Sequence, residues 1–122
     1  MLDIQIKRVY DKSEETDGLR VLVDRLWPRG IRKVDLSFDE WAKYLAPSTA
    51  ARNEFAHKPE NFERFKTRYR QELDINPEAH VFVERLKTEK PSRLTLLYAA
   101  KDPNINHATI LADWLRIQLK RD

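Results

Sequence analysis

The sequence contains no cysteine and only two glycines among its 122 residues. Without cysteine the chain has no disulfide, no thiolate zinc site and no cysteine nucleophile. A Gly-x-Gly-x-x-Gly fingerprint and a P-loop need glycines to bring backbone amides onto phosphates, and neither motif occurs. A Gly-x-Ser-x-Gly nucleophile elbow is absent as well. The sequence therefore excludes the common nucleotide-binding loops and two kinds of nucleophilic hydrolase.

The sequence also lacks a long apolar run. Its longest hydrophobic stretches are far too short to cross a bilayer, and no basic segment leads from Met1 into an apolar one, as in a secretory signal. Hydrophobic residues make up 41% of the chain and charged residues 35%, which is typical of a globular protein. We therefore expect one domain over residues 1–122, located in the cytoplasm and without a membrane partner.

Positive charge exceeds negative charge only slightly. The chain has 23 lysines and arginines against 20 acidic residues, a formal net charge of +3. A general polyanion binder usually has a more lopsided balance or a long basic tail. Basic residues nevertheless gather in two segments, 25–33 and 64–70 ("RFKTRYR"). A nucleic-acid contact through these segments is one reading, and a solvated helix face explains the second segment equally simply.

The hydrophobic pattern predicts three strands and several helices. Segments 4–10, 20–26 and 94–100 have β-rich patterns, and the last is apolar enough to be a central strand covered by helices on both sides. Helices are predicted over 38–45 after a Ser37–Glu40 capping box, over 48–55 and 59–73, from Pro77, and from about Asn106. The order of these elements predicts a small α/β fold, a helix–sheet–helix sandwich with a mainly parallel sheet.

Ligands of parallel sheets bind beyond the carboxyl ends of the strands, and two polar segments follow strands here. They are "DRLWPRG" (24–30) and "KDPNINHA" (101–108). Arg25, Arg29 and Lys101 are suited to holding phosphate or carboxylate. His107 is a candidate acid or base, and Asp24 is a second candidate catalytic residue, which would orient an arginine or the substrate.

The remaining candidates have structural readings as well. Tyr98, Trp27 and Trp41 would line the wall of the cleft, although tryptophans are often core residues. Asp102 and Asn106 would contact the ligand or merely cap the last helix. Asp24 could instead pair with an arginine inside the fold.

The sequence shows no metal-binding motif and leaves the cofactor open. The three histidines, His57, His80 and His107, do not form a His-x-x-x-His pair. His80 is expected in solvent, and His57 could lie at the rim of the cleft. A magnesium site from Asp24 and Asp102 is weakly supported, because no third acid is placed near them.

Several segments together resemble one protein family. They are "RVYD", "DGLRVLVDRLWPRG", "WAKYLAPS", "EFAHKPENFERFKTRYRQEL" and "LTLLYAAKDPNINHATIL". From about Ile6 to Leu119 the chain resembles the YeaO-like branch of domain-of-unknown-function family 488. The resemblance implies a small α/β fold of bacterial or archaeal origin and no particular activity.

The broader family typically has an Asp-x-Arg-x-x-Pro-like segment and a Cys-His-Arg-like triplet. "DRLWPR" (24–29) resembles the first, with Arg25 directly after Asp24. At the triplet, Asn106 stands in place of the cysteine and Ala108 in place of the arginine, while His107 matches. The resemblance thus implies no thiol mechanism for this chain.

These observations lead to one hypothesis and two rivals. The leading hypothesis is a cleft that binds a phosphate- or nucleotide-like anion, in a protein that could be an enzyme. The first rival is a nucleic-acid-associated module that uses segments 25–33 and 64–70. The second is a protein-binding domain, which a large exposed apolar patch would support.

Overall fold

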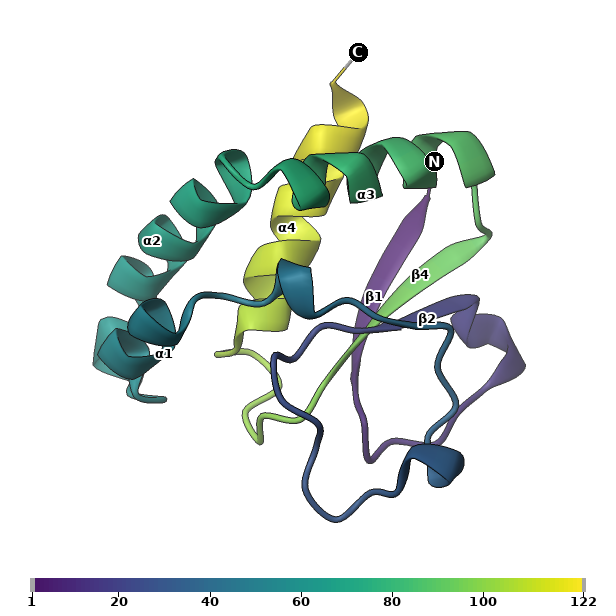
Figure 1. The fold of residues 1–122 in the computed structure, drawn as a ribbon, viewed down its shortest axis with the longest axis horizontal. Coiled ribbons are helices and arrows are strands. Elements are labelled where there is room, and N and C mark those ends of the chain that lie inside the picture. The colour runs from purple at the N-terminus through teal and green to yellow at the C-terminus, as the bar shows by residue number, and fades with distance from the viewer. Residues whose placement is uncertain (1, 122) are drawn as a thin grey trace.

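The computed structural model describes residues 2–121, and it confirms the α/β class (Figure 1). The strands are β1 (Asp3–Arg8), β2 (Leu19–Leu22), β3 (Glu40–Trp41) and β4 (Arg93–Tyr98). The α-helices are α1 (Thr49–Phe55), α2 (Phe62–Asp74), α3 (Pro77–Glu89) and α4 (His107–Lys120). Short 3-10 helices lie between several of these elements.

The four strands form one sheet in the order β1-β4-β2-β3, and every neighbouring pair is parallel. Leu96 of β4 lies opposite Ile6 of β1 and Val21 of β2, so β4 is a central strand as predicted. Because all strands run the same way, their carboxyl ends meet at one edge of the sheet. That edge positions the candidate site.

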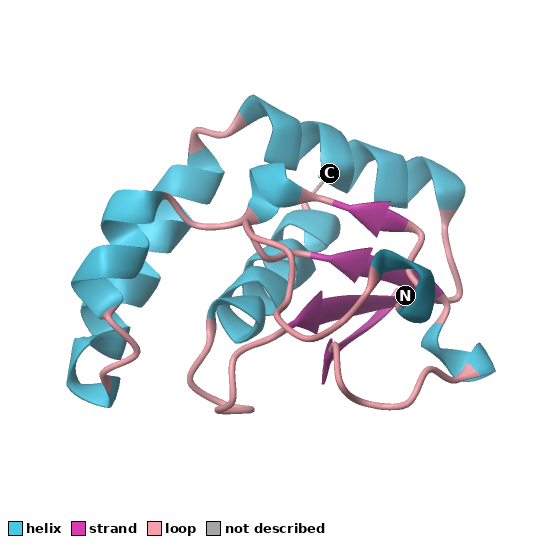
Figure 2. Ribbon diagram, turned by 60° about the horizontal axis from the view of Figure 1, so that its bottom comes forward, coloured by secondary structure: helices cyan, strands magenta, loops and turns pink. Residues whose placement is uncertain are grey.

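Alternate residues of β4 face two different cores. Leu94 and Leu96 face the larger core, where α4 packs against β1 and β4 while α2 and α3 pack against α4 (Figures 1 and 2). Leu97 faces a smaller core with Leu22 and Trp41. This second face is covered by the 3-10 helix Glu15–Asp17 and by the largely irregular segment 23–39, where the predicted sandwich had α-helices on both faces of the sheet.

The helix predicted over 38–45 is wrong. Residues Glu40–Trp41 form the edge strand β3, and Lys43–Leu45 form a single 3-10 turn. Backbone pairing with β2 overrides the local pattern: Asp39 N donates to Arg20 O (2.7 Å) and Ala42 N donates to Leu22 O (2.8 Å). The apolar stripe is consequently divided between the two cores, Phe38 and Trp41 in the smaller one and Ala42 and Leu45 in the larger one.

Helices α1, α3 and α4 begin where their capping residues predicted, whereas α2 begins at Phe62, after the 3-10 turn Pro59–Asn61. The Ser48 hydroxyl accepts from Ala51 N (3.1 Å), and the Asn76 side chain accepts from Glu78 N (3.0 Å). Asn106 caps α4 by accepting from Thr109 N (3.0 Å). The strand predicted over 20–26 ends earlier, at Leu22. It ends there because the chain beyond Val23 leaves the sheet to form the wall of a pocket.

A buried ionic network lies under the second face of the sheet. The Asp17 carboxylate, 1% exposed, accepts from Lys7 Nζ (3.1 Å), from Gln5 Nε2 (3.1 Å) and from the Arg20 guanidinium. Burial by itself raises the pKa of Asp17, but its hydrogen bonds with Glu14 N, Lys7 and Arg20 outweigh burial and lower that pKa. The network therefore holds the loop 9–18 against β1 and β2 as an ionised cluster.

Gly18 ends the 3-10 helix of this loop in a conformation that only glycine accepts. Its φ is +67°, and an added Cβ would lie 2.3 Å from Arg93 O. Because Gly18 has no side chain, the backbone can pass close to Arg93, and β2 begins directly beside β4. Within residues 2–121, no helix is both long and apolar enough to span a membrane.

Candidate functional site

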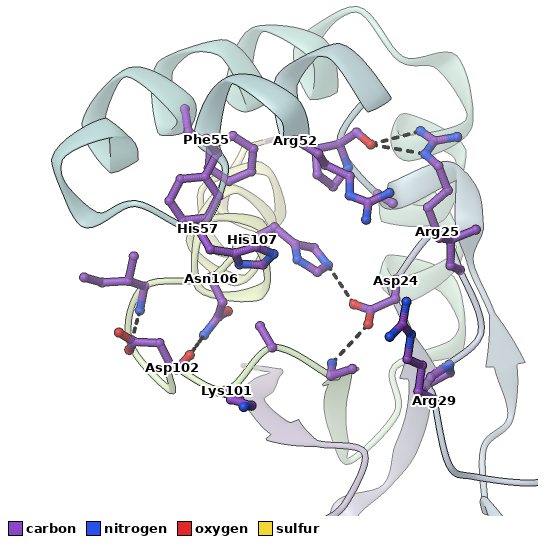
Figure 3. Close-up of a pocket in the computed structure, with 18 of the residues that line it drawn as sticks. Asp24, Arg25, Arg29, Arg52, Phe55, His57, Lys101, Asp102, Asn106 and His107 are labelled. Carbon is purple, nitrogen blue, oxygen red and sulfur yellow. Dashed lines mark hydrogen bonds and ion pairs between the residues drawn. The ribbon is translucent and has the colours of Figure 1, made fainter.

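A pocket of about 660 Å³ opens at the carboxyl edge of the sheet (Figure 3). The structure brings together here residues of the two segments that the sequence singled out, 24–30 after β2 and 101–108 after β4. Helix α1, the chain on either side of it and α2 complete the wall. The lining residues from these other elements are Ala46, Pro47, Arg52, Phe55, His57 and Phe65.

Asp24 is held at the back of this pocket by backbone groups. Its Oδ2 accepts a hydrogen bond from Ala99 N (3.0 Å), and its own carbonyl accepts from Trp41 Nε1 (2.8 Å). Its other oxygen, Oδ1, lies 3.2 Å from His107 Nε2. The partner of Asp24 is thus a histidine, and Asp24 forms no ion pair with any arginine of residues 2–121.

His107 is the first residue of α4, and its ring lies between α4 and the end of β2. The Nε2 atom lies 3.1 Å from Val23 O as well as 3.2 Å from Asp24 Oδ1. The ring also makes an edge contact with Tyr69 of α2, with 6.3 Å between the ring centres. His107 is therefore fixed from three sides while it lines the pocket.

The four lysines and arginines of the pocket differ in their partners. Arg25 donates from Nη2 to Pro47 O (3.0 Å), so part of its guanidinium is used within the wall. Arg29, Arg52 and Lys101 come from three different elements, and their side chains have no hydrogen bond or ion pair with any other residue in the range 2–121. Figure 3 shows Arg29, Arg52 and Lys101 around the opening. Three cationic groups thus remain available to a ligand.

Asn106 and Asp102 have structural partners. Asn106 is 1% exposed; its oxygen caps α4, and its Nδ2 donates to Asp102 O (2.8 Å). The Asp102 carboxylate accepts from Ile105 N and Asn104 N, and these two bonds lower the pKa of Asp102. Both residues line the pocket, and both stabilise the turn that leads into α4.

The three aromatic candidates occupy different places. Trp27 lines the pocket and donates from Nε1 to Ile31 O (2.6 Å). Trp41 packs edge-on against Trp27, with 5.3 Å between the ring centres, and lies behind the wall. Tyr98 is buried outside the lining, and burial raises the pKa of its hydroxyl. Trp41 therefore supports the wall through Asp24 O, while Tyr98 belongs to the core.

Sequence reasoning missed Arg52, Phe55 and Phe65 as pocket residues. Arg52 lies one turn after the Ser48 cap of α1, and the helix is placed beside the pocket by long-range contacts with α2. His57, considered as a rim residue, does line the pocket and packs on Phe55. The chain reaches this position through two consecutive left-handed residues, Ala56 (φ 50°) and His57 (φ 55°).

The basic segment 64–70 is partly neutralised by carboxylates. Arg68 pairs with Glu54 and lies 3.6 Å from Glu72 Oε2. Lys66 pairs with Glu63 (3.2 Å). Arg64 and Arg70 are exposed on α2 and remain the cationic groups of this segment that a polyanion could reach.

No group of three or more histidine, cysteine, aspartate or glutamate residues within 2–121 is arranged to hold a metal ion. His80 is exposed on α3, where its Nε2 lies 2.8 Å from Asp74 O and its ring packs on Trp114.

Comparison with known proteins places the chain in a family. Residues 3–122 match a family model described as "Inactive DUF488-N3 subclade". The chain is 47% identical over 115 residues to "Uncharacterized protein YeaO" of Escherichia coli, which covers 94% of this chain and 98% of the relative. It is 38% identical over 112 residues to "Uncharacterized protein Rv3073c" of Mycobacterium tuberculosis, with 92% of each chain covered. No solved structure matches the chain significantly.

These matches run over nearly the whole chain and agree with the resemblance seen in its segments. The protein therefore belongs to the YeaO-like branch of the DUF488 family, in the subclade described as inactive DUF488-N3.

Proposed function

We propose that this protein binds a small anionic molecule, with a phosphate- or nucleotide-like group, in the pocket at the carboxyl edge of the sheet. The observation that carries the proposal is the set of three unpaired cations, Arg29, Arg52 and Lys101, in the wall of one cavity. Guanidinium and ammonium groups without carboxylate partners favour a bound anion. Elsewhere in the described chain, several basic side chains are paired with acids.

The size and lining of the pocket agree with a small ligand. Its volume of about 660 Å³ is within the range of small-molecule sites, roughly 300–1,000 Å³. Four lysines and arginines face two carboxylates in the lining, which leaves an excess of two positive charges when the histidines are neutral. Phe55, Phe65 and Ile105 add apolar surface for the uncharged part of the ligand.

Binding without covalent catalysis is the activity that these residues favour. Asn106 is buried, and its amide is engaged at both ends, so it offers no nucleophile at the start of α4. The chain contains no cysteine that could serve as a nucleophile. The word "inactive" in the description of the matching family points in the same direction. The absence of cysteine also leads us to propose a cytoplasmic location.

A second candidate function is acid–base catalysis by His107, with Asp24 as the residue that orients the ring. The contact of 3.2 Å between His107 Nε2 and Asp24 Oδ1 favours it. Phosphate release from nucleotides or sugar phosphates would be followed with wild type and with His107→Ala. Turnover that is lost in the variant supports catalysis, and ligand binding without turnover supports the binding function alone.

The test of binding is ligand-induced thermal stabilisation. Nucleotides, sugar phosphates and inorganic phosphate would be screened for a rise in Tm, because a ligand that binds only the folded state raises its stability. Arg29→Ala is expected to abolish the rise. Arg70→Ala is the matched control, because it removes an exposed arginine from α2 outside the pocket lining. An unchanged rise in Arg29→Ala, or a loss in Arg70→Ala alone, would contradict the proposed site.

A further inference from the structure

The two ring nitrogens of His107 lie in different surroundings. Nε2 has two neighbours, Val23 O at 3.1 Å and Asp24 Oδ1 at 3.2 Å. A backbone carbonyl and a carboxylate oxygen only accept hydrogen bonds, so a lone pair on Nε2 would face two acceptors. Nε2 therefore carries a hydrogen whether the ring is neutral or charged, and it donates to Val23 O.

The other nitrogen, Nδ1, has no neighbour of this kind. It has no hydrogen-bond partner among residues 2–121, and it is not buried, since Asp24 Oδ1 is the one buried side-chain nitrogen or oxygen without a partner in that range. The His107 side chain is 15% exposed and lines the pocket. Nδ1 is consequently the ring atom that gains or loses a proton, and it does so beside the ligand position.

Asp24 has one buried oxygen beside the ring of His107. Its Oδ1 is buried, and the ring hydrogen on Nε2 is directed at Val23 O, so no hydrogen bond satisfies this oxygen. A positive charge 3.2 Å away compensates a buried carboxylate oxygen better than a neutral ring does. Asp24 thus acts on a ligand through His107, as a positioning residue.

We propose that His107 determines which anion the pocket accepts: protonated at Nδ1, it donates to a fully ionised oxyanion, and its neutral form accepts only a ligand that brings its own hydrogen. This inference rests on the proposed anion-binding function. Affinity for an oxyanion such as sulfate then rises as the pH falls. Histidines gain their proton between about pH 8 and pH 5.

The charged and titratable groups around His107 come from several elements. They are Asp24, Arg25 and Arg29 after β2, Arg52 of α1, His57 after α1, Tyr69 and Glu72 of α2, and Lys101 and Asp102 after β4. Arginine, lysine and carboxylate side chains do not change charge between about pH 8 and pH 5. Burial raises the pKa of Tyr69 and keeps it neutral. Only His57 could imitate the effect of His107.

The experiment measures sulfate affinity by calorimetry at about pH 8 and about pH 5.5, the range in which histidine titrates. Sulfate is the probe because its charge is constant there, unlike that of phosphate. The wild-type protein is expected to bind sulfate about tenfold more tightly at the lower pH, the effect of one charge-assisted hydrogen bond. His107→Gln should remove the pH dependence, and His57→Gln should retain it. His80→Gln is the control outside the pocket.

The outcomes separate this inference from the proposed function. Sulfate binding with equal affinity at both pH values overturns the role of His107 and leaves the anion site standing, whereas no sulfate binding at either pH overturns both. A pH dependence that survives in His107→Gln and disappears in His57→Gln also overturns the inference. In Asp24→Asn the affinity for sulfate at about pH 5.5 should fall, and an unchanged affinity contradicts the positioning role.

The tautomer gives a test that does not depend on any variant folding. Nitrogen-15 spectra of the wild-type imidazole at about pH 8, where histidine is neutral, should show hydrogen on Nε2 of His107. Hydrogen on Nδ1 in the neutral ring would overturn the inference, since Nδ1 could then not be the site that gains the proton.

Discussion

The replacement Asp17→Asn tests how far the buried ionic network stabilises the fold. Asp17 is 1% exposed and holds two cations, Lys7 and Arg20, whose side chains are 14% and 6% exposed. Asparagine keeps the shape and one acceptor oxygen but removes the negative charge, so Arg20 loses its ionic partner and Lys7 keeps only Glu14. Breaking a buried pair costs about 3–5 kcal/mol because the remaining charge stays buried. We expect the free energy of unfolding to fall by about 3 kcal/mol, near the lower end of this range, since Lys7 also pairs with Glu14.

The loss is measured by urea unfolding followed by far-ultraviolet circular dichroism. With an unfolding entropy of about 2.1 cal/mol/K per residue, about 3 kcal/mol corresponds to a fall in Tm of roughly 12 °C for a chain of this length. Asp35→Asn is the matched control: Asp35 pairs with Arg32 in a bridge whose side chains are 52% and 80% exposed. That control should change the free energy of unfolding by less than about 0.5 kcal/mol.

The same network predicts a direction for pH dependence. The pKa of Asp17 is lower in the folded state than its ordinary value of 3.8, so its contribution to stability is complete above that value. The contribution is lost as the pH falls through the folded-state pKa, below 3.8. Wild type and Asp17→Asn should therefore converge in stability in strong acid. A loss in Asp17→Asn below about 1 kcal/mol at neutral pH, or a difference that persists in acid, would refute the reasoning.

Two further predictions concern other parts of the chain. Gly18→Ala should destabilise the fold by at least about 2 kcal/mol in the same urea assay, because φ is +67° and the new Cβ would meet Arg93 O at 2.3 Å; stability equal to wild type would contradict this close approach. If the protein were a nucleic-acid module, polyanion binding would weaken steeply with salt and would weaken again in a protein with both Arg68→Ala and Arg70→Ala. We expect no steep salt dependence and no effect of the double replacement, because Arg68 is already paired with Glu54. Salt-sensitive polyanion binding that the double replacement reduces would favour the rival function.

Local patterns predicted most of the fold because they depend on neighbouring residues. Ser48, Asn76 and Asn106 begin helices through bonds to amides two or three residues later, which a linear sequence displays directly. The continuous apolar run 94–98 likewise predicted a central strand, and β4 is central. The failure at 38–45 has the opposite cause. The pairing of Asp39 and Ala42 with β2 is not visible in the local pattern.

The sequence could place some residues of the candidate site together, but not all of them. Asp24, Arg29, Lys101 and His107 could be placed near one another, because parallel strands carry the residues after their ends to one edge of the sheet. Arg52 could not be placed, since α1 reaches the pocket only through its packing on α2. The partner of Asp24 was equally hidden: the sequence left an arginine or a ligand as alternatives, and the structure has His107.

The sequence by itself determined the α/β class, the helix starts, the exclusion of cysteine chemistry and the sheet edge at which to look for a ligand. Each follows from residue type, from periodicity or from spacing along the chain. Only the tertiary structure decided which cations stay unpaired, that Asp17 is a buried ionic centre, and which groups surround the ring of His107. These properties depend on atoms from segments far apart in the sequence, because pairing and desolvation are set by what folding brings within a few ångströms.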